Sequence, residues 1–220
     1  MLVYGKNILN EIDKSKIKKV YIASSNYIDF LTNNKIKYEF VDKKRLDNLT
    51  RYANHQNIVI DILDYEYYTM DDIDSDFIVV LDHIEDPHNL GAIIRTCECA
   101  GIKNIIIPRD RAALVNDTVV KVSCGAIEHV KIIMVSNLNN AITNLKKQNY
   151  FVYAADMDGK NYLDIDYADK MVLVIGNEGS GISRLLRENA DEIISIPMKG
   201  TINSLNASAS AAILIYGMLR

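Results

Sequence analysis

The sequence predicts an α/β fold in two parts, the larger built on a mainly parallel sheet that helices cover on both faces. Short, fully apolar runs recur from Phe77 onward, and most are separated by segments long enough for a helix. Strands that are apolar on both faces are typical of parallel sheets buried between two helix layers. Charge is also spread unevenly along the chain, which separates a front part from this body.

The net charge of −4 combines three unlike segments. Residues 1–60 hold 11 Lys or Arg and 6 Asp or Glu, whereas residues 61–76 hold 7 acidic residues and no basic one. Residues 77–220 are almost neutral, with 14 basic and 16 acidic residues. This pattern predicts a first domain at 1–65, an acidic linker at 66–76 and a second domain at 77–220. The basic excess of the front fits a solvated surface at least as well as binding to nucleic acid.

The sequence of the front part, residues 1–65, predicts a small α/β unit. β-Branched and aromatic runs predict strands, and apolar residues at helical spacing predict short helices between them. The expected strands are 19–22, 38–41 and 58–62, and the expected helices are 8–12, 27–31 and 45–49.

The body predicts six strands at a longer spacing. They are expected at 77–81, 104–107, 130–135, 150–154, 171–175 and 193–196. Ligands of parallel sheets bind where loops leave the carboxyl ends of the strands. The loops after Leu81, Ile175 and Ile196 are therefore the expected functional loops.

Composition excludes several classes of protein. With 49% hydrophobic and 25% charged residues, the chain is typical of a globular domain. No signal peptide is visible, and no apolar run is long enough to cross a bilayer. The three cysteines, Cys97, Cys99 and Cys124, contain no Cys-x-x-Cys pair, which argues against a disulfide framework and a zinc site. We expect a cytoplasmic protein without a metal or a membrane partner.

The first functional loop runs from Asp82 into a helix that Asp86 and Pro87 are suited to begin. Asn89 and Arg95 follow, and the guanidinium of an arginine near a helix start can bind a phosphate through two parallel hydrogen bonds. The alternative is a surface ion pair between Arg95 and Glu98. His83 and His88 lack a third ligand at metal spacing, so they are interpreted as ordinary polar residues of the loop.

The second functional loop is Gly176-Asn177-Glu178-Gly179-Ser180-Gly181, directly after an apolar strand. Its glycines allow a tight turn and a close approach of backbone to a ligand. It is neither Gly-x-Gly-x-x-Gly nor a Walker loop, and a purely structural turn is an equal alternative. Because Glu178 would repel a phosphate, a neutral or cationic ligand fits better.

The third functional loop leads from Ile196 and Pro197 through Ser204 and Asn206 into the last helix. The polar side chains of Ser204 and Asn206 stand at the start of that helix, where they could cap free N–H groups or contact a ligand. An apolar face of the helix is predicted by helical spacing. It comprises Leu205, Ala209, Ala212, Ile213, Tyr216 and Leu219.

These loops resemble the three motifs of the SpoU (TrmH) family of RNA ribose 2′-O-methyltransferases, and they occur in the family's order. The segment Ser123 to His129 is also similar to the family's segment. The front, with Val3-Tyr4-Gly5 and His55-Gln56, resembles the ribosomal-protein-like domain that precedes the catalytic domain in members acting on ribosomal RNA. The three motifs are Asp86-Pro87-x-Asn89-x-Gly91-x-x-x-Arg95, Gly176-Asn177-Glu178-x-x-Gly181, and Ile196-Pro197-Met198-x-Gly200 continuing to Ser204-Leu205-Asn206.

Two positions depart from the family's pattern. Asn57 stands where that front domain commonly has glycine, which weakens this part of the resemblance. Ala207 stands where the family often has valine, and we expect this change to affect packing and not chemistry.

The resemblance implies a trefoil-knotted SPOUT methyltransferase domain, a homodimer, RNA as substrate and S-adenosylmethionine as methyl donor. A knot would be a rare exception to unknotted topology. It also implies catalytic roles for one set of residues and cofactor contacts for another. The implied catalytic residues are Asn89, Arg95, Glu178, Ser204 and Asn206. The implied cofactor residues are Ala155, Gly176, Asn177, Glu178, Gly181, Ile196, Met198, Ser204, Leu205 and Asn206.

Several functions stay open at this point. The two-part plan favours a guanosine of 23S ribosomal RNA over transfer RNA by analogy only. A transfer RNA 2′-O-methyltransferase and a non-catalytic RNA-binding protein on the same fold are the alternatives. A base-nitrogen methyltransferase is disfavoured because all three loops match the ribose-modifying motifs, and a dinucleotide enzyme because the glycine fingerprint is missing.

Overall fold

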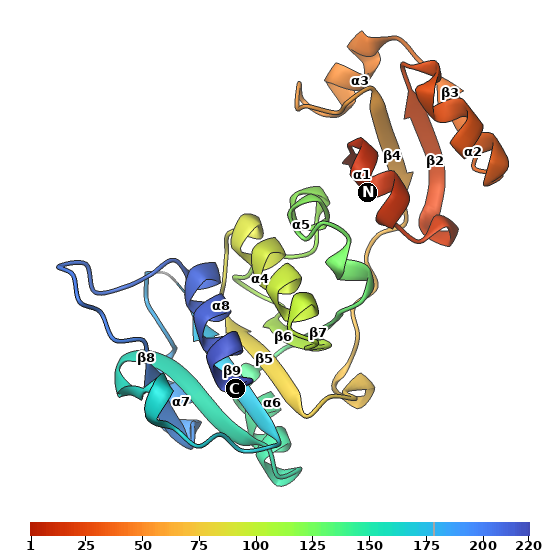
Figure 1. The fold of residues 1–220 in the computed structure, drawn as a ribbon. Coiled ribbons are helices and arrows are strands. Elements are labelled where there is room, and N and C mark those ends of the chain that lie inside the picture. Colours follow the sequence, from red (N-terminus) through yellow and green to blue (C-terminus); the bar gives the residue numbers. More distant parts are fainter. Residues whose placement is uncertain (178) are drawn as a thin grey trace.

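The computed structural model describes residues 1–177 and 179–220. Two sheets organise it: a four-stranded sheet in an N-terminal unit (β1 to β4 with their helices) and a six-stranded sheet in a C-terminal unit (β5 to α8). The N-terminal unit lies against the α5 side of the C-terminal unit, and an extended segment connects the two (Figure 1).

The N-terminal sheet has the strand order β1-β4-β2-β3, in which β2 and β3 are parallel and β4 is antiparallel to both of its neighbours. The three predicted strands are confirmed; the additional strand β1 is three residues long, too short to give a recognisable sequence period. The strands are β1 (Leu2–Tyr4), β2 (Ile17–Ile22), β3 (Tyr38–Phe40) and β4 (Ile58–Ile62). The helices are α1 (Lys6–Glu11), α2 (Ile28–Asn33) and α3 (Lys43–Leu49), with short 3₁₀ turns η1 (Lys14–Lys16) and η2 (Ser25–Tyr27).

Every strand pair of the C-terminal sheet is parallel, in the order β10-β8-β9-β5-β6-β7. All six predicted strands are confirmed. The strand β8 runs far beyond its prediction, and its register with β10 shifts between Ile193 and Ile194. The strands are β5 (Phe77–Asp82), β6 (Asn104–Pro108), β7 (Lys131–Val135), β8 (Phe151–Asn161), β9 (Met171–Gly176) and β10 (Glu192–Ser195).

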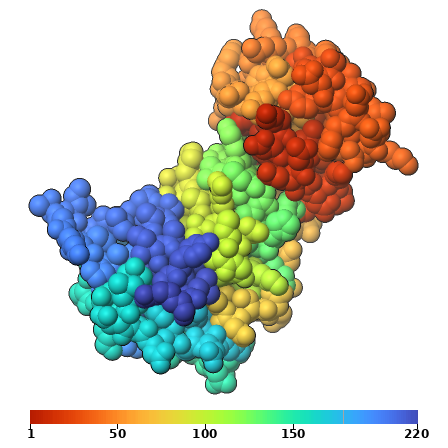
Figure 2. Space-filling model, in the orientation of Figure 1, coloured from red at the N-terminus to blue at the C-terminus, as the bar shows by residue number. Residues whose placement is uncertain are grey.

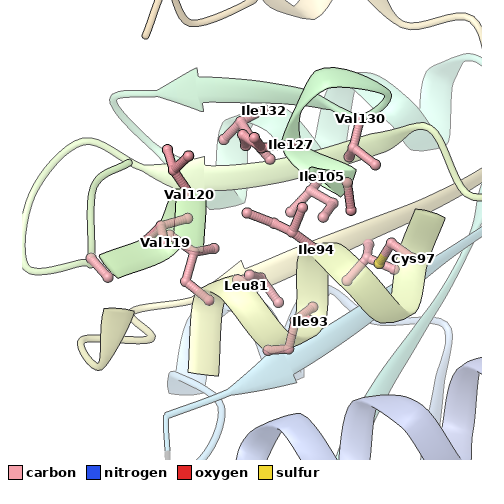
Figure 3. Packing of buried hydrophobic residues seen from close by; sticks show 14 of the residues in the cluster. Leu81, Ile93, Ile94, Cys97, Ile105, Val119, Val120, Ile127, Val130 and Ile132 are labelled. Carbon is pink, nitrogen blue, oxygen red and sulfur yellow. The ribbon is translucent and has the colours of Figure 1, made fainter. Parts of the chain in front are cut away.

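Helices cover both faces of this sheet, as the apolar runs predict. Along β5, Val79 and Leu81 pack toward one helix layer, while Ile78 and Val80 pack toward the other, because successive side chains of a strand point to opposite faces. The first layer contains α4 (Pro87–Cys99), α5 (Asp117–Val122) and α8 (Ala207–Met218). The second contains α6 (Leu138–Lys147) and α7 (Arg184–Asn189). Figure 3 shows the core beneath α4 and α5. No described helix combines the length and apolarity that a bilayer crossing requires.

The apolar face predicted for the last helix is wrong. The helix buries Ala211, Leu214, Ile215 and Met218, whereas the predicted face is largely exposed, with Tyr216 53% accessible. The physical reason is that α8 is apolar around most of its circumference, so spacing alone cannot decide which side meets the core.

The connecting segment is fixed to the C-terminal unit by its tyrosines. Tyr68 pairs in parallel with the edge strand β7, donating from its N–H to Ile132 O at 2.9 Å and accepting from Met134 N at 3.1 Å. The Tyr65 hydroxyl accepts from Ile132 N, and the Tyr67 hydroxyl accepts from Val115 N at 2.9 Å. Beyond them a short turn, η3 (Met70–Asp72), leads into β5. The acidic segment is therefore a strap along the sheet edge.

Candidate active site

The first functional loop is built as the sequence predicts. The Asp86 carboxylate caps α4 by accepting from His88 N at 2.9 Å, and Pro87 occupies the first helical position. One turn later Asn89 is buried, with 7% of its surface accessible, while Arg95 projects from the exposed side of the same helix. Arg95 Nη1 lies 3.6 Å from Cys124 Sγ and forms no ion pair with Glu98 within the described residues.

A glycine in this helix allows Arg95 to stand beside the neighbouring segment. A Cβ atom at Gly91 would lie 2.8 Å from Val122 Cβ, which is closer than two carbon atoms approach. Helix α4 therefore packs on α5 at a distance that only glycine permits. The turn after α5, which carries Cys124, is brought to Arg95 by this close packing.

The second functional loop closes on itself directly after β9. Asn177 and Gly181 exchange backbone hydrogen bonds of 3.1 and 2.9 Å. A Cβ at Gly176 would lie 2.3 Å from Gly181 C, so no side chain fits there. The positive φ of Gly181, 67°, explains the second required glycine. Glu178 falls outside the described residues.

Asparagine 177 joins the second loop to the first. Its Nδ2 donates to His83 O at 2.8 Å, and its Oδ1 accepts from Gly179 N at 2.8 Å. The amide side chain of Asn177 thus fixes the shape of the second loop and also holds that loop close to the end of β5.

A buried carboxylate that the sequence did not single out supports both loops. Asp82 ends β5 and is almost wholly buried. It accepts from Ser183 N, the residue before α7, at 2.6 Å, and contacts His83 Nδ1 at 2.5 Å. The sequence did contain a signal for this role: an acidic residue is the last residue of a fully apolar strand. A charge buried in that position requires hydrogen-bonding partners.

The third functional loop reaches the first through Asn206. Its Nδ2 donates to Asn89 Oδ1 at 3.0 Å, across a separation of 117 residues. Its Oδ1 caps α8, accepting from Ser208 N at 2.9 Å and from Ala209 N at 3.4 Å. The helix cap predicted for Asn206 is therefore confirmed, and the same side chain also links the third loop to the first.

The remaining expected residues are only partly assembled. Ala155 lies within β8 and Ile196 directly follows β10, and both are half-buried, whereas Met198, Ser204 and Leu205 lie on an exposed loop before α8. This loop projects from the body (Figures 1 and 2). Met198 and Leu205 are 37% and 39% accessible, so this loop exposes apolar side chains to solvent.

Charges beyond Ala155 hold the extension of β8 in place. Arg187 forms ion pairs with Asp156 and, at 2.9 Å, with Asp158. The hydrogen bond from Arg187 lowers the pKa of the Asp158 carboxyl.

Burial raises the pKa of the Cys97 thiol, which is consistent with an inert core residue. Within the described residues, no group of His, Cys, Asp and Glu side chains has the arrangement of a metal site.

Family models match almost the whole chain. Residues 76–216 match the SpoU rRNA methylase family, and residues 2–68 match the substrate-binding domain of RNA 2′-O ribose methyltransferases. The chain belongs to the SpoU rRNA methylase family. Membership makes it an RNA methyltransferase of the SpoU (TrmH) type, as the three loops indicated.

Relatives and solved structures of this family agree over the full length. A Bacillus subtilis protein assigned to the TrmH family of tRNA/rRNA methyltransferases is 35% identical over 99% of this chain and 94% of its own length. The AdoMet-bound rRNA methyltransferase of Sinorhizobium meliloti is 25% identical, with a TM-score of 0.83 over 99% of this chain and 85% of that one. The SpoU methyltransferase AviRb of Streptomyces viridochromogenes, 23% identical, shares the fold with a TM-score of 0.84 over 100% of this chain and 88% of that one.

Proposed function

We propose that the protein transfers the methyl group of S-adenosylmethionine to a ribose 2′-hydroxyl of ribosomal RNA. The observation that carries the proposal is the hydrogen bond from Asn206 to Asn89, which joins the first and third motifs at one sheet edge. Asn177 ties the second motif to the same edge through His83. Three loops that resemble ribose-modifying motifs thus form one connected polar site.

The residues at this edge fit S-adenosylmethionine. The loop around Gly176 is a cradle in which a Cβ would collide with backbone, so a ligand can approach main-chain groups closely. Exposed Met198 and Leu205 supply apolar surface for an adenine ring, and backbone near Ala155 and Ile196 supplies hydrogen bonds. Glu178, Gly181 and Ser204 complete the proposed cofactor side. When bound, the cofactor supplies an electrophilic methyl group on a sulfonium centre.

Arg95 is the proposed catalytic centre on the RNA side. A 2′-hydroxyl is a weak nucleophile, so it must lose its proton as it attacks, and holding it in line with the methyl group supplies much of the rate. The exposed guanidinium of Arg95 can hold the adjacent phosphate and orient the hydroxyl. Asn89 orients the site from beneath, held by Asn206. Ser204 is the competing contact for the hydroxyl, and Glu178, which lies outside the described residues, is proposed to help shape the site.

The N-terminal unit is the proposed RNA-reading domain, with boundaries at 1–65, a linker at 66–76 and the catalytic domain at 77–220. Its two motif segments meet: Gln56 Oε1 accepts from Lys6 N at 2.9 Å, directly after Gly5. The match of residues 2–68 to a substrate-binding family supports this role. If its basic side chains contact phosphates, RNA affinity falls as the salt concentration rises.

We propose a homodimer through α8, and the exposed apolar face of this helix supports the proposal. Tyr216 and Leu219 are about half exposed there, beside Ala209 and Ala212. A second copy would remove this apolar surface from water, which is favourable in proportion to the area buried. We place the trefoil knot of the family at the third loop, where the chain enters α8. A cytoplasmic location is part of the proposal, because ribosomal RNA is the proposed substrate.

The target is proposed to be a guanosine of 23S ribosomal RNA, with transfer RNA as the alternative because relatives are assigned to tRNA/rRNA methyltransferases. Mapping 2′-O-methyl marks across both RNA classes in a deletion strain tests this. Loss of a mark from transfer RNA alone would reject the ribosomal assignment.

The substitution Arg95→Ala tests the chemistry. We expect methylation to fall by on the order of a thousandfold, as when a preorganised donor is removed, with cofactor binding in calorimetry unchanged. Arg184→Ala is the matched control, since Arg184 is an exposed arginine of α7 that pairs with Glu188. Wild-type turnover in Arg95→Ala would refute the assignment of Arg95. No heat with S-adenosylmethionine would instead favour a non-catalytic RNA-binding protein.

A further inference from the structure

The segment Ser123–His129, which follows α5, lies between the N-terminal unit and Arg95. On one side, Lys16 Nζ of η1 lies 2.5 Å from Glu128 Oε2, across 112 residues of sequence. The Glu128 side chain is only 14% accessible and that of Lys16 is 39% accessible. This ion pair is therefore partly shielded from solvent and is stronger than an exposed pair.

Steric contact supports the same junction. Gly125 has a φ of 87°, and a Cβ there would lie 2.8 Å from Glu11 Cβ at the end of α1. Nearby, Lys121 Nζ lies 4.7 Å from the centroid of the Tyr4 ring on β1. Helix α1, strand β1 and turn η1 thus all meet this part of the C-terminal unit, and Figure 2 shows the two units in contact there.

On its other side the segment holds the proposed catalytic arginine. Cys124, in the left-handed region at a φ of 50°, receives Arg95 Nη1 at 3.6 Å. Buried Ser123 donates to Val120 O at 3.0 Å, and Ile127 lies in the core with Ile94 of the arginine's own helix (Figure 3). A shift of the segment would therefore move the partner of Arg95.

The connecting strap fixes the far end of the segment. Tyr65 contacts Val130 O at 3.4 Å and Ile132 N at 3.2 Å, just beyond His129. The N-terminal unit is thus attached near the C-terminal end of the segment twice, by Lys16 at Glu128 and by the strap just beyond His129.

We propose that the Ser123–His129 segment couples the docked N-terminal unit to Arg95, so that this unit contributes to the turnover rate as well as to RNA affinity. Lys16 and Glu128 are positioning residues that act by holding the turn that carries Cys124. This inference rests on the proposed function of Arg95. A unit that merely tethers RNA would change KM and leave kcat alone.

The ion pair allows a charge-swap test in the full-length chain. In Lys16→Glu, two carboxylates would face each other, and we expect kcat at saturating RNA to fall on the order of tenfold, because small misplacements of catalytic groups are costly. The double variant Lys16→Glu/Glu128→Lys restores the pair and should restore kcat to within about twofold. Lys14→Glu is the control on the same turn, since Lys14 hydrogen-bonds Asn34 within the N-terminal unit.

The swap also separates coupling from direct RNA contact. Both Lys16→Glu and the double variant carry glutamate at position 16, so an RNA contact made by Lys16 would be lost in both. A loss of activity that the double variant does not rescue would overturn the proposal. A rise in KM with unchanged kcat in Lys16→Glu would overturn it as well.

A second readout does not depend on methylation. In a Cys99→Ser background, Cys124 is the one exposed thiol of the three cysteines, because Cys97 is buried. We expect Lys16→Glu to speed the reaction of Cys124 with a disulfide reagent several-fold, and the swap to reverse this. Equal thiol rates in all variants would refute the coupling. If the wild type failed to methylate RNA, the proposed function would be refuted. The thiol reaction rates would still test whether the N-terminal unit is coupled to the segment that carries Cys124.

Discussion

Asn206 performs two tasks with one side chain, and substitutions can separate them. Its Oδ1 caps α8, and its Nδ2 donates to the buried Asn89. Asn206→Ala removes both. Losing a helix cap costs about 1 kcal/mol and losing the hydrogen bond about another 1 kcal/mol. The free energy of unfolding should therefore fall by about 2 kcal/mol, which lowers Tm by on the order of 5 °C in a protein of this size.

Asn206→Asp keeps the cap and loses only the donor. A carboxylate accepts from Ser208 N as the amide does, and its charge is favoured by about 0.5 kcal/mol at a helix N-terminus. That gain offsets much of the lost hydrogen bond to Asn89, so we expect stability within about 1 kcal/mol of wild type. Because two oxygens would then face each other, we expect methyl transfer to fall on the order of a hundredfold in both variants.

Denaturant unfolding and methyl transfer to RNA, measured on the same preparations, test this separation. Asn137→Ala is the matched control: Asn137 caps α6 on the opposite face of the sheet by accepting from Asn140 N at 2.9 Å. It should cost about 1 kcal/mol and leave turnover unchanged. Wild-type turnover in Asn206→Asp would show that the bridge to Asn89 is not needed for catalysis.

Three further predictions concern the frame around the site. Gly176→Ala should lower the free energy of unfolding by about 1–3 kcal/mol and abolish the heat of cofactor binding, because the new Cβ would lie 2.3 Å from backbone. Gly179→Ala is the control: its Cβ would lie 3.4 Å from its nearest neighbour, so it should be nearly neutral in unfolding experiments. Tyr65→Phe should cost about 1–2 kcal/mol in denaturant unfolding, while Tyr52→Phe, 77% exposed, should cost nothing measurable. Burial raises the pKa of Tyr65, so stability should fall above about pH 10, where the unfolded tyrosine ionises, and Tyr65→Phe should reduce that slope in pH-dependent unfolding.

The strands of the fold could be predicted because their signal is local. Each apolar run of the body, such as 171–175, records burial on both faces within a few residues. Strand order could not be predicted, since it depends on contacts between distant runs. For example, β8 follows β7 in the sequence after α6, yet it lies at the other side of the sheet between β10 and β9. For α8 the local signal was misleading, because the helix is apolar around most of its circumference and spacing alone does not select the buried side.

The local structure of the candidate site could be predicted, and the contacts between its loops could not. The helix cap at Asp86 and the tight turn at Gly176 follow from capping and backbone geometry. The role of Asp82 as the buried support of two loops depends on Ser183, 101 residues away, and no spacing rule links them. The fixed strap was missed because its tyrosines bind through hydroxyl groups, which leave no periodic pattern.

The contact between Asn89 and Asn206 has a consequence for the order in which the fold forms. Its partners are 117 residues apart in the sequence. Contacts between distant residues form late, since a long loop must close first. The sheet of the C-terminal unit can therefore form before Asn206 reaches Asn89, so the link between the first and third loops is expected to be among the last contacts of the candidate site to form.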